Sequence, residues 1–115
     1  MYNGVERRRY QRASASFLVS YKNMYSDSDF NLSQTINISQ GGLLLTTSEL
    51  FPKGTTLKML TQFPFFSERA NLSGRVVRQR EVAKGLIYET GIEFTNLEQV
   101  VFEKLGEFVK KRPLV

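Results

Sequence analysis

Apolar and polar residues alternate at every second position through several short segments, and this period constrains the fold more than any other feature of the sequence. The first such segment runs from Ala13 to Tyr21. One of its faces carries Ala13, Ala15, Phe17, Val19 and Tyr21. Period two places successive side chains on opposite faces of a β-strand, so a half-buried strand is predicted here.

Five further segments show strand-like patterns, separated by stretches rich in Ser, Asn, Asp, Gly and Pro that favour turns. They cover residues 30–36, 43–46, 57–63, 72–79 and 86–94. In the last of them we expect Leu86, Tyr88, Thr90, Ile92 and Phe94 to point inward and Glu89 and Glu93 to point outward. Short strands joined by turns predict an antiparallel sheet.

The last segment changes to a helical period. Its apolar stripe consists of Val101, Phe102, Leu105, Phe108 and Val109. Asn96 is the predicted N-cap with Gln99 as its capping-box partner, and Pro113 is expected to end the helix. Six strands and one helix predict an all-β fold, a six-stranded antiparallel barrel with a C-terminal helix packed on it.

Composition excludes much chemistry. A chain of 115 residues suits one domain, and it contains no Cys and no His, which removes disulfides, thiolate nucleophiles, the usual zinc ligands and the commonest general base. No carboxylate pair or metal cluster can be assembled from the motifs, so we expect neither enzyme activity nor a cofactor. Neither a secretory signal nor a membrane span is evident, which predicts a cytoplasmic protein without membrane insertion.

A cluster of arginines precedes the first predicted strand. The seven residues from Glu6 to Arg12 hold four of the chain's 16 Lys and Arg residues. Guanidinium groups resist burial unless they are paired, so residues 1–12 are interpreted as a flexible basic arm and residues 13–115 as the folded domain. The net charge of +5 favours a phosphate-bearing partner. A solvated tail is the plain alternative.

A second motif follows later in the chain. The triplet Asn-x-Ser occurs three times, and only the copy Asn37-Ile38-Ser39 has a glycine, Gly42, three positions after the serine. The pair Gly41-Gly42 is predicted to adopt backbone angles that other residues avoid. The alternative is that these residues form only a hairpin turn.

The two motifs together resemble the signature of the PilZ domain, Arg-x-x-x-Arg followed by Asp/Asn-x-Ser-x-x-Gly. Here these are Arg8-Arg9-Tyr10-Gln11-Arg12 and Asn37-Ile38-Ser39-Gln40-Gly41-Gly42. The segments 74–78 and 88–94 also resemble recurrent strands of that family, so the resemblance covers nearly the whole chain. It implies a Greek-key β-barrel and a bacterial receptor for cyclic di-GMP.

Carried over residue by residue, the resemblance implies that Arg8 and Arg12 contact phosphate and guanine, that Asn37 and Ser39 contact the guanine edge, and that Gly42 sets the turn geometry. The chemistry agrees, because arginine presents a planar fork of donors that suits phosphate oxygens and guanine O6 and N7.

Arg7 directly precedes the first motif, and a basic residue there resembles the pattern associated with an intercalated ligand dimer. The expected partner is an effector protein in control of motility, biofilm or exopolysaccharide, and the chain itself is expected to be a monomer or weak dimer. The alternative function is a small-barrel binder of single-stranded nucleic acid. It requires aromatic residues on an exposed strand, whereas the phenylalanines here fall mainly on inward positions, so no specific nucleic acid is expected.

Overall fold

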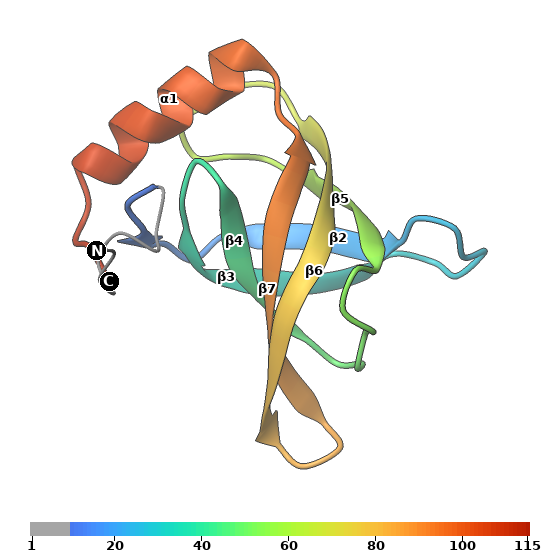
Figure 1. The fold of residues 1–115 in the computed structure, drawn as a ribbon. Helices are drawn as coiled ribbons and strands as arrows, with labels where there is room; N and C mark the ends of the chain where they lie inside the picture. Colours follow the sequence, from blue (N-terminus) through green and yellow to red (C-terminus); the bar gives the residue numbers. More distant parts are fainter. Residues whose placement is uncertain (1–9) are drawn as a thin grey trace, which may run out of the picture.

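The computed structural model describes residues 10–115, which form seven strands and one helix (Figure 1). The elements are β1 Ala13–Ser14, β2 Leu18–Asn23, β3 Asn31–Ile38, β4 Gly42–Thr47, β5 Thr56–Thr61, β6 Ala70–Ala83, β7 Ile87–Asn96 and α1 Gln99–Lys110. Six strands pair antiparallel in the order β3-β2-β5-β6-β7-β4, and β4 pairs back onto β3 to close the ring. The predicted six-stranded barrel with a C-terminal helix is confirmed.

The seventh strand arises because the first predicted strand is interrupted. Both β1 and β2 pair with the same edge of β3, and the ladder breaks at residues 15–17. There the Thr35 hydroxyl donates to the Ala15 carbonyl at 2.7 Å and accepts the Phe17 N–H at 3.1 Å. This side chain replaces the missing ladder bonds, so the predicted alternation survives the break.

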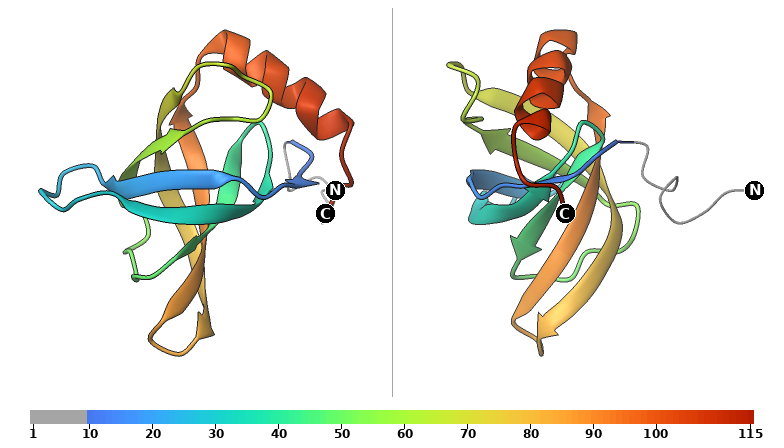
Figure 2. Two further views of the ribbon diagram at one scale, coloured as in Figure 1. Left: turned by 180° about the vertical axis from the view of Figure 1, so that it is seen from behind. Right: turned by 90° about the vertical axis from the view of Figure 1, so that its left-hand side faces the viewer.

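The barrel encloses the main core, and α1 lies across one end of it (Figures 1 and 2). The largest side chains that are fully buried within the barrel strands are Tyr21, Ile38, Leu45, Leu57 and Met59. The helix buries Val101, Leu105 and Val109, three of the five residues of its predicted stripe, while Phe108 packs against the core half-buried. Within residues 10–115, no helix is long and apolar enough to cross a membrane.

Two detailed predictions are wrong. Leu86 does not point inward but is 68% exposed, because Gly85 turns the chain with φ 69° and β7 begins only at Ile87. Asn96 does not cap the helix. It ends β7, where its side-chain oxygen accepts hydrogen bonds from the Ser73 N–H and hydroxyl at 2.8 and 2.7 Å, and Glu98 takes the N-cap position without a side-chain bond.

Candidate functional site

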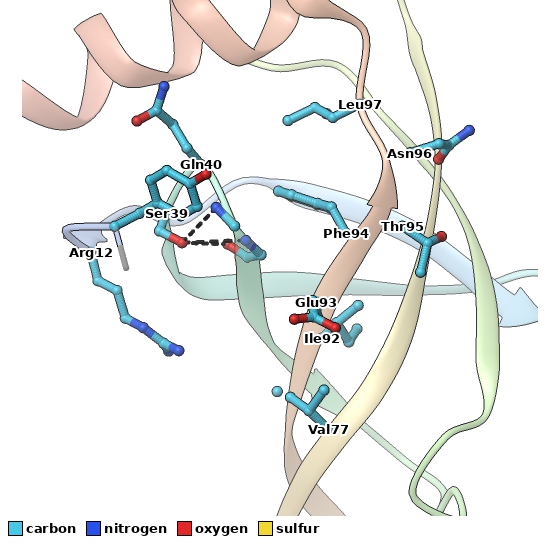
Figure 3. Close-up of a pocket in the computed structure, with 14 residues that line it drawn as sticks. Arg12, Ser39, Gln40, Val77, Ile92, Glu93, Phe94, Thr95, Asn96 and Leu97 are labelled. Atoms are coloured by element: carbon cyan, nitrogen blue, oxygen red, sulfur yellow. Dashed lines mark hydrogen bonds between the residues drawn. The ribbon is translucent and has the colours of Figure 1, made fainter. Parts of the chain in front are cut away.

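A pocket of about 440 Å³ opens where residues 10–12, which we call the root of the arm, meet the β3–β4 turn and β7 (Figure 3). It brings together Arg12 of the first motif and Ser39 and Gly42 of the second, with Glu93 on the wall that β7 provides. Arg7 and Arg8 lie outside the described residues. Residues of both motifs therefore line one cavity.

The root of the arm is fixed to the C-terminal part of the chain. The Tyr10 ring packs edge-on against Phe102 of α1, with centroids 5.8 Å apart. The Arg12 carbonyl accepts the Val115 N–H at 3.1 Å, and the Pro113 carbonyl accepts the Ser14 N–H at 3.1 Å. These contacts hold Tyr10 and Arg12 beside the pocket.

Ser39 holds the β3–β4 turn together. Its hydroxyl oxygen accepts the N–H groups of Gly41 and Gly42 at 3.1 and 3.2 Å, and its own N–H donates to the Gly42 carbonyl at 2.8 Å. A hairpin turn, the plain alternative for this motif, is thus present and also lines the pocket. The guanine contact expected of Ser39 stays a prediction, and its part in shaping the turn is an additional role.

Gly42 has a structural role in addition to the turn geometry predicted for it, which stays a prediction. Positive φ occurs, among the described glycines, only at Gly54 and Gly85, so the motif glycines do not use the left-handed region. A Cβ on Gly42 would instead lie 1.9 Å from the carbonyl oxygen of Ile92. The missing side chain lets β4 approach β7 closely at the register pair Gly42 and Glu93.

Asn37 carries the most unusual polar atom of the region. The residue lies inside β3 rather than after it, is 9% exposed and does not line the pocket. Its side-chain oxygen is buried and has no hydrogen-bond partner in the described part of the chain. Such an atom typically costs about 1–3 kcal/mol, and an orphan polar group in a folded protein calls for an explanation. A β-bulge between Thr35 and Asn37 locally changes the direction of the strand.

Glu93 is a pocket residue that the sequence did not single out. Its carboxylate pairs with the Arg75 guanidinium across β6 and β7 at 2.8 Å, and both side chains are 53% exposed. Glu93 was expected only to point outward, because alternation gives no information about the neighbouring strand. The pocket therefore combines donors from Arg12 with acceptors from Glu93 (Figure 3).

Gln40 connects the second motif to the helix. Its side-chain amide donates to the Phe102 carbonyl at 2.9 Å, and Gly106 makes room for it, since a Cβ there would lie 2.5 Å from the same nitrogen. Tyr10 contacts Phe102 as well. One helical residue thus contacts both halves of the site.

The fold is a closed β-barrel with a pocket at its β3–β4 turn, where residues of both sequence motifs line the cavity. The model of the PilZ domain matches residues 6–111, and the chain belongs to the PilZ family. Among proteins with curated descriptions, none matches the sequence significantly.

Solved structures share the fold at low sequence identity. The Bacillus subtilis inhibitor of motility MotI/DgrA superposes with a TM-score of 0.74 and 18% identity over 90% of this chain, which spans 50% of that protein. The PilZ domain of Escherichia coli YcgR with c-di-GMP gives 0.67 and 17%, covering 90% of this chain and 89% of that one. The PilZ domain of CeSA from a cellulose-synthesizing bacterium gives 0.62 and 18%, covering 86% and 94%.

Proposed function

We propose that this chain is a receptor for cyclic di-GMP, bound between the arginine arm and the pocket at the β3–β4 turn. The observation that carries the proposal is the single cavity shared by Arg12, Ser39 and Gly42 in a chain of the PilZ family. The solved PilZ domain of YcgR, whose fold is similar, holds c-di-GMP.

The residues suit the chemistry of the ligand. Cyclic di-GMP presents two phosphates and two guanines, and the arm supplies Arg7, Arg8 and Arg12 as forked donors for both. Each charge-assisted hydrogen bond of this kind contributes about 1.5–3 kcal/mol. With Arg7 directly before the motif, the arm is proposed to hold an intercalated pair of nucleotides.

Asn37 and Ser39 complete the proposed guanine contact. Guanine presents N–H donors on its Watson–Crick edge, and the orphan oxygen of Asn37 is an acceptor in need of a donor. Ser39 keeps the turn in shape while lining the cavity. The proposed role of Gly42 is the close approach of β4 to β7.

The output is proposed to be a protein partner in the control of motility, biofilm or exopolysaccharide. Closure of the arm over the nucleotide would move Tyr10, and a shift of the β3–β4 turn would move Gln40. Because Tyr10 and Gln40 both contact Phe102, either movement would reach helix α1. No metal or cofactor is invoked, and residues 10–115 hold no cluster of His, Cys, Asp or Glu that could bind a metal ion.

Isothermal titration calorimetry with cyclic di-GMP at near-physiological salt tests the proposal. If an intercalated pair binds, calorimetry should give two nucleotides per chain. A stoichiometry of one nucleotide per chain would contradict the intercalated pair but not the receptor function. Cyclic di-AMP and a single-stranded RNA oligonucleotide serve as controls. Absence of binding to cyclic di-GMP, or RNA binding that persists in Asn37→Ala with a steep salt dependence, would contradict the receptor function.

A further inference from the structure

A groove of about 410 Å³ lies on the outer face of β2, β3 and β5, lined by Leu18, Leu32 and Leu60 with Ser20 and Arg69. We name it the leucine groove after its three leucines. Ser20 stands directly opposite both Leu32 on β3 and Leu60 on β5. A small side chain between two large ones leaves a trough, and Leu18 lies two positions along the same strand. The left-hand view of Figure 2 has β2 and β3 in front.

The leucines of the groove are well exposed. Leu32 is 66% exposed and Leu18 is 53% exposed, while Leu60 is half-buried. Single exposed leucines are common, but neighbouring ones that line a concave surface are typical of interaction sites. Burying them against a partner would remove apolar area from water, which favours association.

Cations surround the groove. Lys22 and Lys58 stand opposite each other across β2 and β5, next in line after Ser20 and Leu60 on the same face, and Arg69 lines the other side. Like charges at directly opposite positions are destabilising. Lys22 lies 5.8 Å from the Phe30 ring centroid, a cation–π contact. The ion pairs Arg75–Glu93 and Arg80–Glu89 do not involve these three cations, and no carboxylate of residues 10–115, Asp27, Asp29 and Glu68 included, pairs with them.

The geometry excludes other occupants. β2, β3 and β5 are each paired on both edges, so no partner can bind there by adding a strand. A second copy of the chain bound through the same face would bring two sets of Lys22, Lys58 and Arg69 into one interface. The groove is lined by leucines rather than by the aromatic residues on which nucleic-acid bases stack.

We propose that the leucine groove docks a partner protein through a segment in which apolar side chains are flanked by Asp or Glu. The apolar side chains fill the trough, and the carboxylates pair with Lys22, Lys58 and Arg69. β2 is three strands from β7 around the ring, so a partner here leaves the pocket open. The proposal does not depend on what the pocket binds.

Selection from a random phage-displayed peptide library on the nucleotide-free protein tests it. We expect the selected peptides to combine Leu-like residues with Asp or Glu. Their affinity, measured by fluorescence polarisation, should fall at least tenfold in Leu32→Ser and in Lys58→Glu. Leu50→Ser is the matched control, because Leu50 is as exposed as Leu32, at 66%, but lies between β4 and β5 and does not line the groove. It should bind as the unaltered protein does.

Three results would overturn the inference. One is selection of basic or uncharged peptides, or of none, and another is equal binding by Leu32→Ser and Leu50→Ser when circular dichroism shows both folded. The third is a concentration-dependent dimer in sedimentation that Leu32→Ser abolishes, since the occupant would then be a second copy.

Discussion

The two concave faces of this barrel are built by opposite means. At the pocket, Gly42 has no side chain and sits against the Ile92 carbonyl, so backbones meet closely and polar groups surround the opening. At the leucine groove, a short side chain, Ser20, separates two leucines, and the hollow is lined by side chains on the outer face of the strands. The difference teaches that the pocket depends on backbone geometry, whereas the groove depends only on side chains that point into solvent. Changes at the β3–β4 turn that shapes the pocket should therefore affect folding as well as binding.

Gly42→Ala is expected to have the largest effect. The new Cβ would meet a backbone oxygen that cannot move without breaking the β4–β7 ladder, so the free energy of unfolding should fall by about 3 kcal/mol, the upper end for overpacking. Urea denaturation measures it. Gly41→Ala is the control, because its Cβ would meet the Tyr10 ring, a side chain that can shift, and it should cost less. Equal losses would contradict this reading of Gly42.

Arg12→Ala should weaken cyclic di-GMP binding by about ten- to a hundredfold, the equivalent of one charge-assisted contact. The Arg12 carbonyl keeps its bond to the Val115 N–H in this variant, so the backbone beside the pocket stays tied to the C-terminal residue. Calorimetry provides the measurement. Arg80→Ala is the matched control, since Arg80 pairs with Glu89 outside the pocket. If both variants bind alike, Arg12 has no part in the site.

Ser39→Ala removes the acceptor of two backbone N–H groups, and we expect a loss of about 1–2 kcal/mol in stability together with weaker nucleotide binding. The comparison variant is Ser33→Ala, at the serine of the first Asn-x-Ser triplet, whose hydroxyl makes no side-chain hydrogen bond among residues 10–115. Thermal denaturation and calorimetry measure the two effects. Unchanged stability in Ser39→Ala would show that the turn does not need the hydroxyl.

Asn37→Leu separates folding from binding at the pocket face. Replacing a side chain whose buried oxygen has no partner by an apolar one of similar size should raise the free energy of unfolding by about 1 kcal/mol while weakening nucleotide binding by about ten- to a hundredfold. Urea denaturation and calorimetry on the same preparation test both. A destabilised variant would mean that the Asn37 amide is satisfied in the folded protein, and an unchanged affinity would remove it from the site.

Leu32→Ser should have the smallest effect on the isolated chain. Because Leu32 is 66% exposed, its stability should stay within about 0.5 kcal/mol and its affinity for cyclic di-GMP should be unchanged. Thermal denaturation and calorimetry provide the two numbers. A large change in stability or in nucleotide affinity would contradict the contrast between the pocket, which depends on backbone geometry, and the leucine groove, which does not.

Much of the fold could be predicted because local sequence patterns indicate which residues form strands and which form the helix. Alternation correctly placed Val19, Tyr21 and Ile92 in the core, and the helical period placed Leu105 there. The errors have a common cause. The Asn96 side chain suits an N-cap, but it accepts hydrogen bonds from Ser73 on the neighbouring strand instead. Leu86 fits the alternating pattern, but it lies in a turn and is exposed. Tertiary contacts override local preference at the ends of elements.

By itself the sequence determined the strands, the helix and the two motifs, because dihedral preference and period act over a few residues. Only the tertiary structure decided which residues meet: Glu93 beside Gly42, Ser20 between Leu32 and Leu60, and Phe102 against both Tyr10 and Gln40. A period of two fixes the face on which a side chain lies but not the strand next to it. That neighbour depends on pairing order and register, which are set by the packing of the whole barrel.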